Sequence, residues 1–180
     1  PLHPYHPAYH PFRWRGWWDY GTGALGDIGC HSLDPVFRAL KLKYPTSIQA
    51  VSTIVNEDSY PLASIVRYEF PAREDMPPLS LTWYDGGMRP MQIPEMESGM
   101  KMGSGGTLYI GDRGKILDDR ILPLSLRESY TPPAPYIPSS PGHEEEWINA
   151  CKGGAAAGSD FEWAGPLTET VLLGNIALRK

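Results

Sequence analysis

The sequence predicts an α+β domain in which an open, mainly antiparallel β-sheet has its helices packed on one face. One helix-like segment comes early in the chain, several strand-like segments follow, and helix-like segments return at the end. Strands that follow one another without intervening helices usually pair antiparallel, and helices grouped at the two ends of such a chain cover the sheet. The 180 residues suffice for one substantial core, so we expect a single domain over residues 1–180.

Residues 1–20 predict an extended arm that leads into an aromatic block. Each proline of "PLHPYHPAYHP" disfavours helix at the residue before it. The block "FRWRGWWDY" sets aromatic rings beside a cation and an anion, a composition that suits a sugar ring. Trp17 and Trp18 fit the filling of a core equally well, and both alternatives stay open. The candidate substrate-binding residues of this segment are Tyr9, His10, Arg15, Trp18 and Asp19.

Residues 24–42 have the apolar period of a helix, within a candidate functional segment that spans 21–42. At about 100° per residue, the apolar side chains fall on one half of this helix. These side chains are Leu25, Ile28, Leu33, Val36, Phe37 and Leu40. Asp27 and His31 lie on the polar half, four residues apart, and therefore project side by side. Spacing alone fits an ordinary solvated face as well as an acid/base pair.

A proline interrupts this helical pattern at Pro35. Inside a helix it removes the hydrogen bond to the carbonyl of His31. The helix is therefore expected to bend there, unless Asp34 caps a second helix that has Pro35 as its first residue.

The sheet is expected within residues 46–126, and two C-terminal helices within 143–180. The predicted strands are 47–55, 63–70 and 79–84, followed by a hairpin over 107–117, because these segments are rich in β-branched and aromatic residues. Several strands carry apolar residues at odd and even positions, so the uncovered face of the sheet is expected to bind a second subunit. Of the closing helices, 143–154 ends at glycines, and the last is expected to begin with Pro166.

Gly21, Gly23 and Gly26 spell G-x-G-x-x-G, the pattern that cradles the pyrophosphate of a dinucleotide. That site needs a buried strand before the glycines and an acidic residue about 20 positions after them. A charged, tryptophan-rich segment precedes these glycines instead, and the carboxylate of Asp27 directly after them would repel a phosphate. We therefore expect no nucleotide site at this motif.

Composition excludes several other classes of function. The net charge of −5 gives no reason to expect nucleic acid or a membrane surface as partner, and no apolar run reaches the roughly 20 residues of a membrane span. Two cysteines form no disulfide framework or zinc pattern, which favours a reduced, cytoplasmic compartment. Both ends look cut from a longer chain, so export stays open. His3, His6 and His10 lie on the arm without a regular element to fix them, so no metal site is expected.

The segment "RGWWDYGTGALGDIGCHSLDP" closely resembles the C-terminal domain of the Gfo/Idh/MocA oxidoreductases, in their bacterial-type subgroup. "HEEEWINACKGG" and "FEWAGPLTETVLLGNIALRK" are similar to the same subgroup, so the resemblance covers nearly the whole chain. In that family a D-x-x-x-H pair faces the nicotinamide of NAD or NADP, which an N-terminal Rossmann domain binds. Asp27 and His31 are the matching positions. The Rossmann domain and its Glu-Lys-Pro motif do not occur in these 180 residues.

The resemblance implies a substrate-binding and oligomerisation domain of an NAD(P)-dependent oxidoreductase that acts on a sugar or polyol. His31 would accept the hydroxyl proton and Asp27 would orient the imidazole, while this chain alone would be inactive. A homo-oligomer through the sheet face is the expected assembly. Two alternatives stay open: an NAD-dependent glycoside hydrolase of the same superfamily, and a non-catalytic oligomerisation domain.

Overall fold

The computed structural model describes residues 4–96 and 99–180 and has the α+β architecture that the sequence predicts. The chain divides into two compact units. The first comprises Pro1–Pro90 together with Phe161–Lys180, and the second comprises Met91–Asp160. Each unit has its own three-stranded antiparallel sheet within the described residues, where the sequence had suggested one sheet over 46–126.

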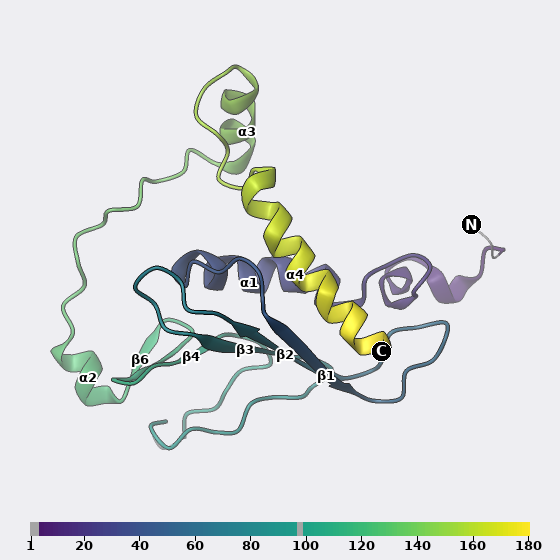
Figure 1. Ribbon diagram of the computed structural model, residues 1–180, viewed down its shortest axis with the longest axis horizontal. Coiled ribbons are helices and arrows are strands. Elements are labelled where there is room, and N and C mark those ends of the chain that lie inside the picture. The colour runs from purple at the N-terminus through teal and green to yellow at the C-terminus, as the bar shows by residue number, and fades with distance from the viewer. Residues whose placement is uncertain (1–3, 97–98) are drawn as a thin grey trace. The chain divides into compact units, whose positions relative to one another are not determined.

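The sheet of the first unit has the order β1-β2-β3, with all neighbours antiparallel (Figure 1). Its strands are β1 (Ser47–Ser52), β2 (Ser64–Phe70) and β3 (Leu79–Tyr84). Alternate residues of β2 point to opposite faces, and Val66, Tyr68 and Phe70 form the buried row. The strand predicted over 47–55 stops at Ser52, because Thr53 turns the chain: its Oγ1 accepts hydrogen bonds from the backbone N–H groups of residues 62 and 63.

Helices α1 (Gly23–Ala39) and α4 (Phe161–Arg179) cover the inner face of this sheet (Figure 1). The helices bury Leu25, Leu33, Val36, Phe37, Leu167, Val171 and Leu178 against the strands. Gly174 lets the two helices and β2 approach closely, since a Cβ there would lie 2.0 Å from Tyr68 Oη and 2.6 Å from Leu25 Cδ2. The core of this unit therefore lies between the two helices and the sheet.

The helix predicted over 24–42 ends at Ala39, three residues early. Lys41 adopts a left-handed conformation (φ 49°), and the backbone N–H of Leu42 donates to the carbonyl of Phe37. This geometry ends a helix and buries the apolar residue that follows it, here Leu42. Arg73 Nε donates to the carbonyl of Leu40 over 2.6 Å and satisfies a further end group of the helix.

α1 runs through Pro35 as one helix, so the alternative of a second helix capped by Asp34 is wrong. The Asp34 carboxylate instead accepts a hydrogen bond from Trp163 Nε1 of α4 at 2.6 Å.

Ile28 was expected on the apolar half but is 48% exposed, because the buried stripe of α1 is narrower than half of the helix. α4 begins at Phe161 and contains Pro166, so the predicted start at Pro166 is also wrong.

The outer face of the first sheet is polar at one end and apolar at the other. In the polar half, Arg67 Nε lies 2.6 Å from the Glu69 carboxylate, which also accepts a hydrogen bond from Ser80 Oγ. In the apolar half, Val51, Ile65 and Tyr84 stand in one row across the three strands. The expectation of apolar residues on both faces therefore holds for one end of the sheet only.

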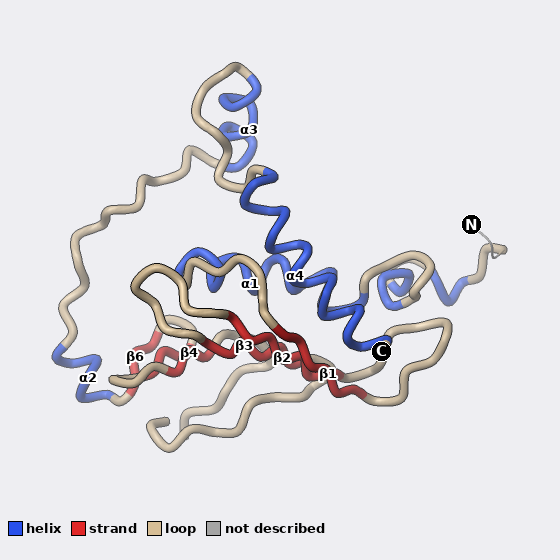
Figure 2. The backbone as a smooth tube through the Cα atoms, viewed as in Figure 1, coloured by secondary structure: helices blue, strands red, loops and turns tan. Residues whose placement is uncertain are grey.

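The second unit contains the sheet β4-β5-β6 and two helices. Its elements are β4 (Leu108–Ile110), β5 (Lys115–Leu117), β6 (Arg120–Leu122), α2 (Leu124–Ser129) and α3 (His143–Cys151). The hairpin predicted over 107–117 is confirmed, with the Gly111 N–H bonded to the Gly114 carbonyl. Figure 2 shows the long loop between α2 and α3, a segment rich in proline. Among the described residues, no helix combines the length and hydropathy of a membrane span.

Candidate functional site

Asp27 and His31 project from the side of α1 that lies opposite its buried residues. Leu25, Gly29 and Leu33 mark the buried side of the helix, and a four-residue step places His31 one turn after Asp27. The Asp27 side chain is about one-third exposed, and His31 is exposed. Both side chains therefore stand on a surface that a ligand can reach.

Asp27 forms an ion pair with Arg15, a residue of the short helix η2 (Arg13–Gly16). Arg15 Nε lies 3.1 Å from Asp27 Oδ2, but no hydrogen bond forms there, because the N–H of the buried Nε is not directed at an acceptor. The guanidinium carbon lies 4.1 Å from the ring centre of Phe12 and 4.5 Å from that of Trp14. These rings give Arg15 two cation–π contacts. The aromatic block thus holds the Arg15 guanidinium beside the Asp27 carboxylate.

The His31 side chain makes no hydrogen bond or ion pair with any residue that the structure describes. The Asp27 carboxylate contacts Arg15 instead of His31. The two members of the expected pair therefore share a face of α1 without a hydrogen bond between them. Pro35 has no N–H to offer the carbonyl of His31. The turn that carries the histidine is therefore irregularly bonded, and the imidazole is open to an incoming group.

Tyr9 and Trp17 pack in an aromatic cluster at the base of the arm. The Tyr9 ring lies 4.9 Å from that of Trp17 and 5.1 Å from that of Tyr20, both edge to face. The hydroxyl of Tyr20 has a raised pKa, first because of burial and then because of the nearby Tyr9. His10 is exposed directly after this cluster, at the end of η1 (Pro7–Tyr9). Of these residues, the structure exposes His10 most freely.

Trp18 is bound to a loop of the chain itself. Its ring centre lies 3.6 Å from that of Tyr60, and its Nε1 donates to the carbonyl of Asn56 at 3.0 Å. The guanidinium of Arg179, at the end of α4, lies 4.7 Å from the Trp18 ring. Asp19 is exposed beside it. These contacts favour the core-filling alternative for Trp18, and its part in substrate binding stays a prediction.

The glycines of the G-x-G-x-x-G pattern lie against the chain's own atoms. A Cβ at Gly21 would lie 2.4 Å from the carbonyl oxygen of Arg15, and one at Gly23 would lie 2.4 Å from the Tyr60 ring. Gly23 also has a positive φ of 67° at the start of α1, where L-residues are strained. Close packing against Arg15 and Tyr60 accounts for these two glycines without a nucleotide.

Of the histidines in the arm, the structure describes His6 and His10. His6 Nδ1 accepts a hydrogen bond from the backbone N–H of Ala8 at 3.1 Å and so caps η1. His3 lies outside the described residues. Within the described ranges, no group of three His, Cys, Asp or Glu side chains has the spacing of a metal site.

Two contacts that position the site were not predicted from the sequence. Asn175 of α4 is buried, and its Nδ2 donates to the carbonyl of Thr22 at the start of α1 over 2.8 Å. The other is the bond from Trp163 to Asp34, and the Trp163 ring also stacks on Arg38 at 4.2 Å. The partners are 153 and 129 residues apart, so no local pattern signals them.

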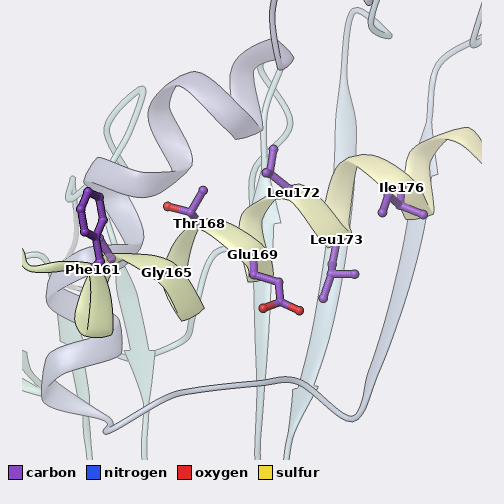
Figure 3. Close-up of a pocket in the computed structure, with 8 residues that line it drawn as sticks. Phe161, Gly165, Thr168, Glu169, Leu172, Leu173 and Ile176 are labelled. Carbon is purple, nitrogen blue, oxygen red and sulfur yellow. The ribbon is translucent and has the colours of Figure 1, made fainter.

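An apolar hollow follows the exposed side of α4 (Figure 3). Phe161, Leu172 and Ile176 line it, and they are 94%, 39% and 52% exposed. Glu169 is the titratable residue of the lining. A single carboxylate on an apolar wall offers no acid/base pair, so this hollow is no second candidate for the chemistry.

Comparison with known families finds a match in the N-terminal part of the chain. Residues 1–68 match the model described as "Oxidoreductase family, C-terminal alpha/beta domain", of Gfo/Idh/MocA type. The matched segment includes the arm, the aromatic block, all of α1 and the first two strands as far as residue 68. No curated protein matches the chain.

Proposed function

Because residues 1–68 match the C-terminal domain of the Gfo/Idh/MocA oxidoreductases, we propose that the chain belongs to this family and is the substrate side of an NAD(P)-dependent enzyme. The observation that carries this proposal is the exposed imidazole of His31, one helical turn from a carboxylate held by Arg15. The proposed substrate is a sugar or polyol with an oxidisable carbinol group.

In this proposal His31 is the general base of the reaction. An unpaired ring nitrogen accepts the proton of the substrate hydroxyl as the carbinol is oxidised, and the exposed side chain leaves room for that hydroxyl. Asp27 lies one turn away on the same face, where its carboxylate is paired with Arg15. NAD(P), when bound, supplies the acceptor for the hydride of the carbinol carbon. A positioned general base contributes roughly 10²- to 10⁴-fold in rate.

The cofactor is proposed to be bound mainly by another domain. The glycines at 21 and 23 pack against Arg15 and Tyr60, which supports a structural role for this motif. We propose an N-terminal Rossmann domain in the same polypeptide as the holder of NAD or NADP. The proposed location is the cytoplasm.

Self-association through the outer face of the first sheet remains part of the proposal. The apolar row of Val51, Ile65 and Tyr84 supports it, with Val51 72% exposed. The polar network of Arg67 and Glu69 limits the apolar contact to one end of the sheet.

The experiment uses the polypeptide encoded by the complete reading frame, incubated with NAD or NADP and a panel of sugars, polyols and glycosides. We expect reduced cofactor to accumulate in step with an oxidised sugar or polyol. Hydrolysis of a glycoside without net reduction of the cofactor would favour the NAD-dependent hydrolase instead. In a parallel titration by calorimetry, the 180-residue chain alone is expected to bind neither NAD nor NADP tightly.

A further inference from the structure

We propose that Arg15 is a positioning residue for Asp27, so that it acts on the reaction through the carboxylate and not by binding the substrate. This inference rests on the proposed function, because it assigns a role within the same site. It replaces the sequence-based hypothesis that Arg15 grips a sugar. The chain would then use three residues at this site: a base, a carboxylate and the arginine that fixes the carboxylate.

The contacts of the guanidinium group support this role. Nε lies 3.1 Å from Asp27 Oδ2, and Nη1 donates to the carbonyl of Phe12 at 3.4 Å. The rings of Phe12 and Trp14 lie 4.1 and 4.5 Å from the guanidinium carbon. Two aromatic rings, a carbonyl and a carboxylate therefore lie around the guanidinium. The Arg15 side chain is 30% exposed. These contacts hold the guanidinium beside Asp27.

The backbone fixes the same geometry from the other side. Gly21 follows the aromatic block, and a Cβ at this position would lie 2.4 Å from the Arg15 carbonyl oxygen and 2.5 Å from its Cα. The chain therefore folds back tightly from η2 to the start of α1. That close return places residue 15 of η2 next to residue 27 of α1. Arg15 is thus held at Asp27 by packing as well as by charge.

A fixed cation at Asp27 has a consequence for the reaction. Asp27 is about one-third exposed on α1, so its carboxylate depends on a neighbour for a fixed orientation. Arg15 supplies that neighbour, with Nε 3.1 Å from Oδ2. A planar guanidinium on aromatic faces holds such a geometry better than the flexible ammonium of lysine.

The test is a double-mutant cycle on the complete enzyme, with Arg15→Met, Asp27→Asn and the double variant. We expect Arg15→Met to lower kcat about tenfold with KM nearly unchanged, and to have no further effect once Asp27 is Asn. Arg15→Lys should recover part of the loss because it restores the charge. Arg13→Met is the matched control, since Arg13 is an exposed neighbour in η2, and its kcat should equal that of the parent.

Two results would overturn the proposal. One is a rise in KM that persists in the Asp27→Asn background, which would make Arg15 a substrate ligand. The other is additive effects of the two substitutions on kcat. If Asp27→Asn itself leaves kcat unchanged, the role of Arg15 in the reaction fails, whereas the proposed function fails only if His31→Ala also leaves kcat unchanged. The same cycle measured as melting temperatures of the 180-residue chain separates that case, because a non-additive result there shows that the contact exists.

Discussion

The substitution Gly174→Ala tests the packing that holds α1 in place. Gly174 is buried where α4 crosses α1 and β2. An added methyl group would lie 2.0 Å from Tyr68 Oη and 2.6 Å from Leu25 Cδ2. Tyr68 is fully buried, so its ring has no open space into which to move. We expect the variant to fold with lower stability and with a displaced α1.

The magnitude follows from two opposing effects. Overpacking a well-packed core costs about 1–3 kcal/mol, and the separation from Tyr68 Oη places this case at the upper end. Alanine gains about 1 kcal/mol over glycine inside a helix. The net loss is about 2 kcal/mol, which lowers the melting temperature of a domain of this size by roughly 4–8 °C.

The assay is urea denaturation of the 180-residue chain, with Gly165→Ala as the matched control. Gly165 lies in the same helix, is exposed and has no atom within 4 Å of an added Cβ. The control should therefore stay within about 1 kcal/mol of the parent, because the helix preference of alanine is opposed by the proline ring of the next residue, Pro166. Tyr68→Phe in the Gly174→Ala background should recover part of the loss, because it removes the nearest atom. Equal stability of the two alanine variants would refute the packing argument.

Three further predictions concern the loop, the sheet and the assembly. Arg73→Met should reduce the free energy of unfolding by about 1–3 kcal/mol in urea denaturation, because it removes the donor to the carbonyl of Leu40; unchanged stability would contradict the capping role. Glu69→Gln should lower the melting temperature near neutral pH, and this difference should vanish in acid. The hydrogen bond from Ser80 and then the hydrogen bond from Arg67 lower the pKa of Glu69, so its stabilisation is present above the unfolded pKa and lost as pH falls through the folded one. A difference that grows in acid would refute this sign. Val51→Asp should shift the sedimentation of any dimer toward monomer and leave the circular dichroism unchanged; an unaltered dimer would exclude this face.

The elements that the sequence predicts well are those with a strong local period. α1 is apolar on one side at helical spacing, and β2 alternates between buried and exposed residues along its length. The β4–β5 turn also follows from a local signal, Asp112 to Gly114. β6 and α2 were not predicted, because three and six residues are too few to show a period of apolar residues.

Proline was the misleading residue at the ends of the helices. Pro166 is typical of a first helical position, but α4 begins five residues earlier and passes through it. Tertiary contacts explain the difference. Trp163 precedes the proline and bonds to Asp34 of α1, and this bond holds the first turn of α4 in place.

For the candidate site, the sequence predicted which residues share a face but not which of them touch. Helical spacing brings Asp27 and His31 to one side of α1. The ion pair with Arg15 depends on the tight return of the chain at Gly21, which no periodicity expresses. The hydrogen bond from Asn175 to the carbonyl of Thr22 joins residues 153 positions apart, so only the folded structure reveals it.

The central claim is that His31 is the base of a carbinol oxidation. The most direct test is kcat of His31→Ala in the complete polypeptide with its cofactor, beside Ser32→Ala as a control on the same turn of α1. The account predicts a loss of roughly 10²- to 10⁴-fold for the histidine variant and an unchanged value for the serine variant. Turnover of His31→Ala at the rate of the parent, in a folded enzyme that binds its cofactor normally, would contradict it.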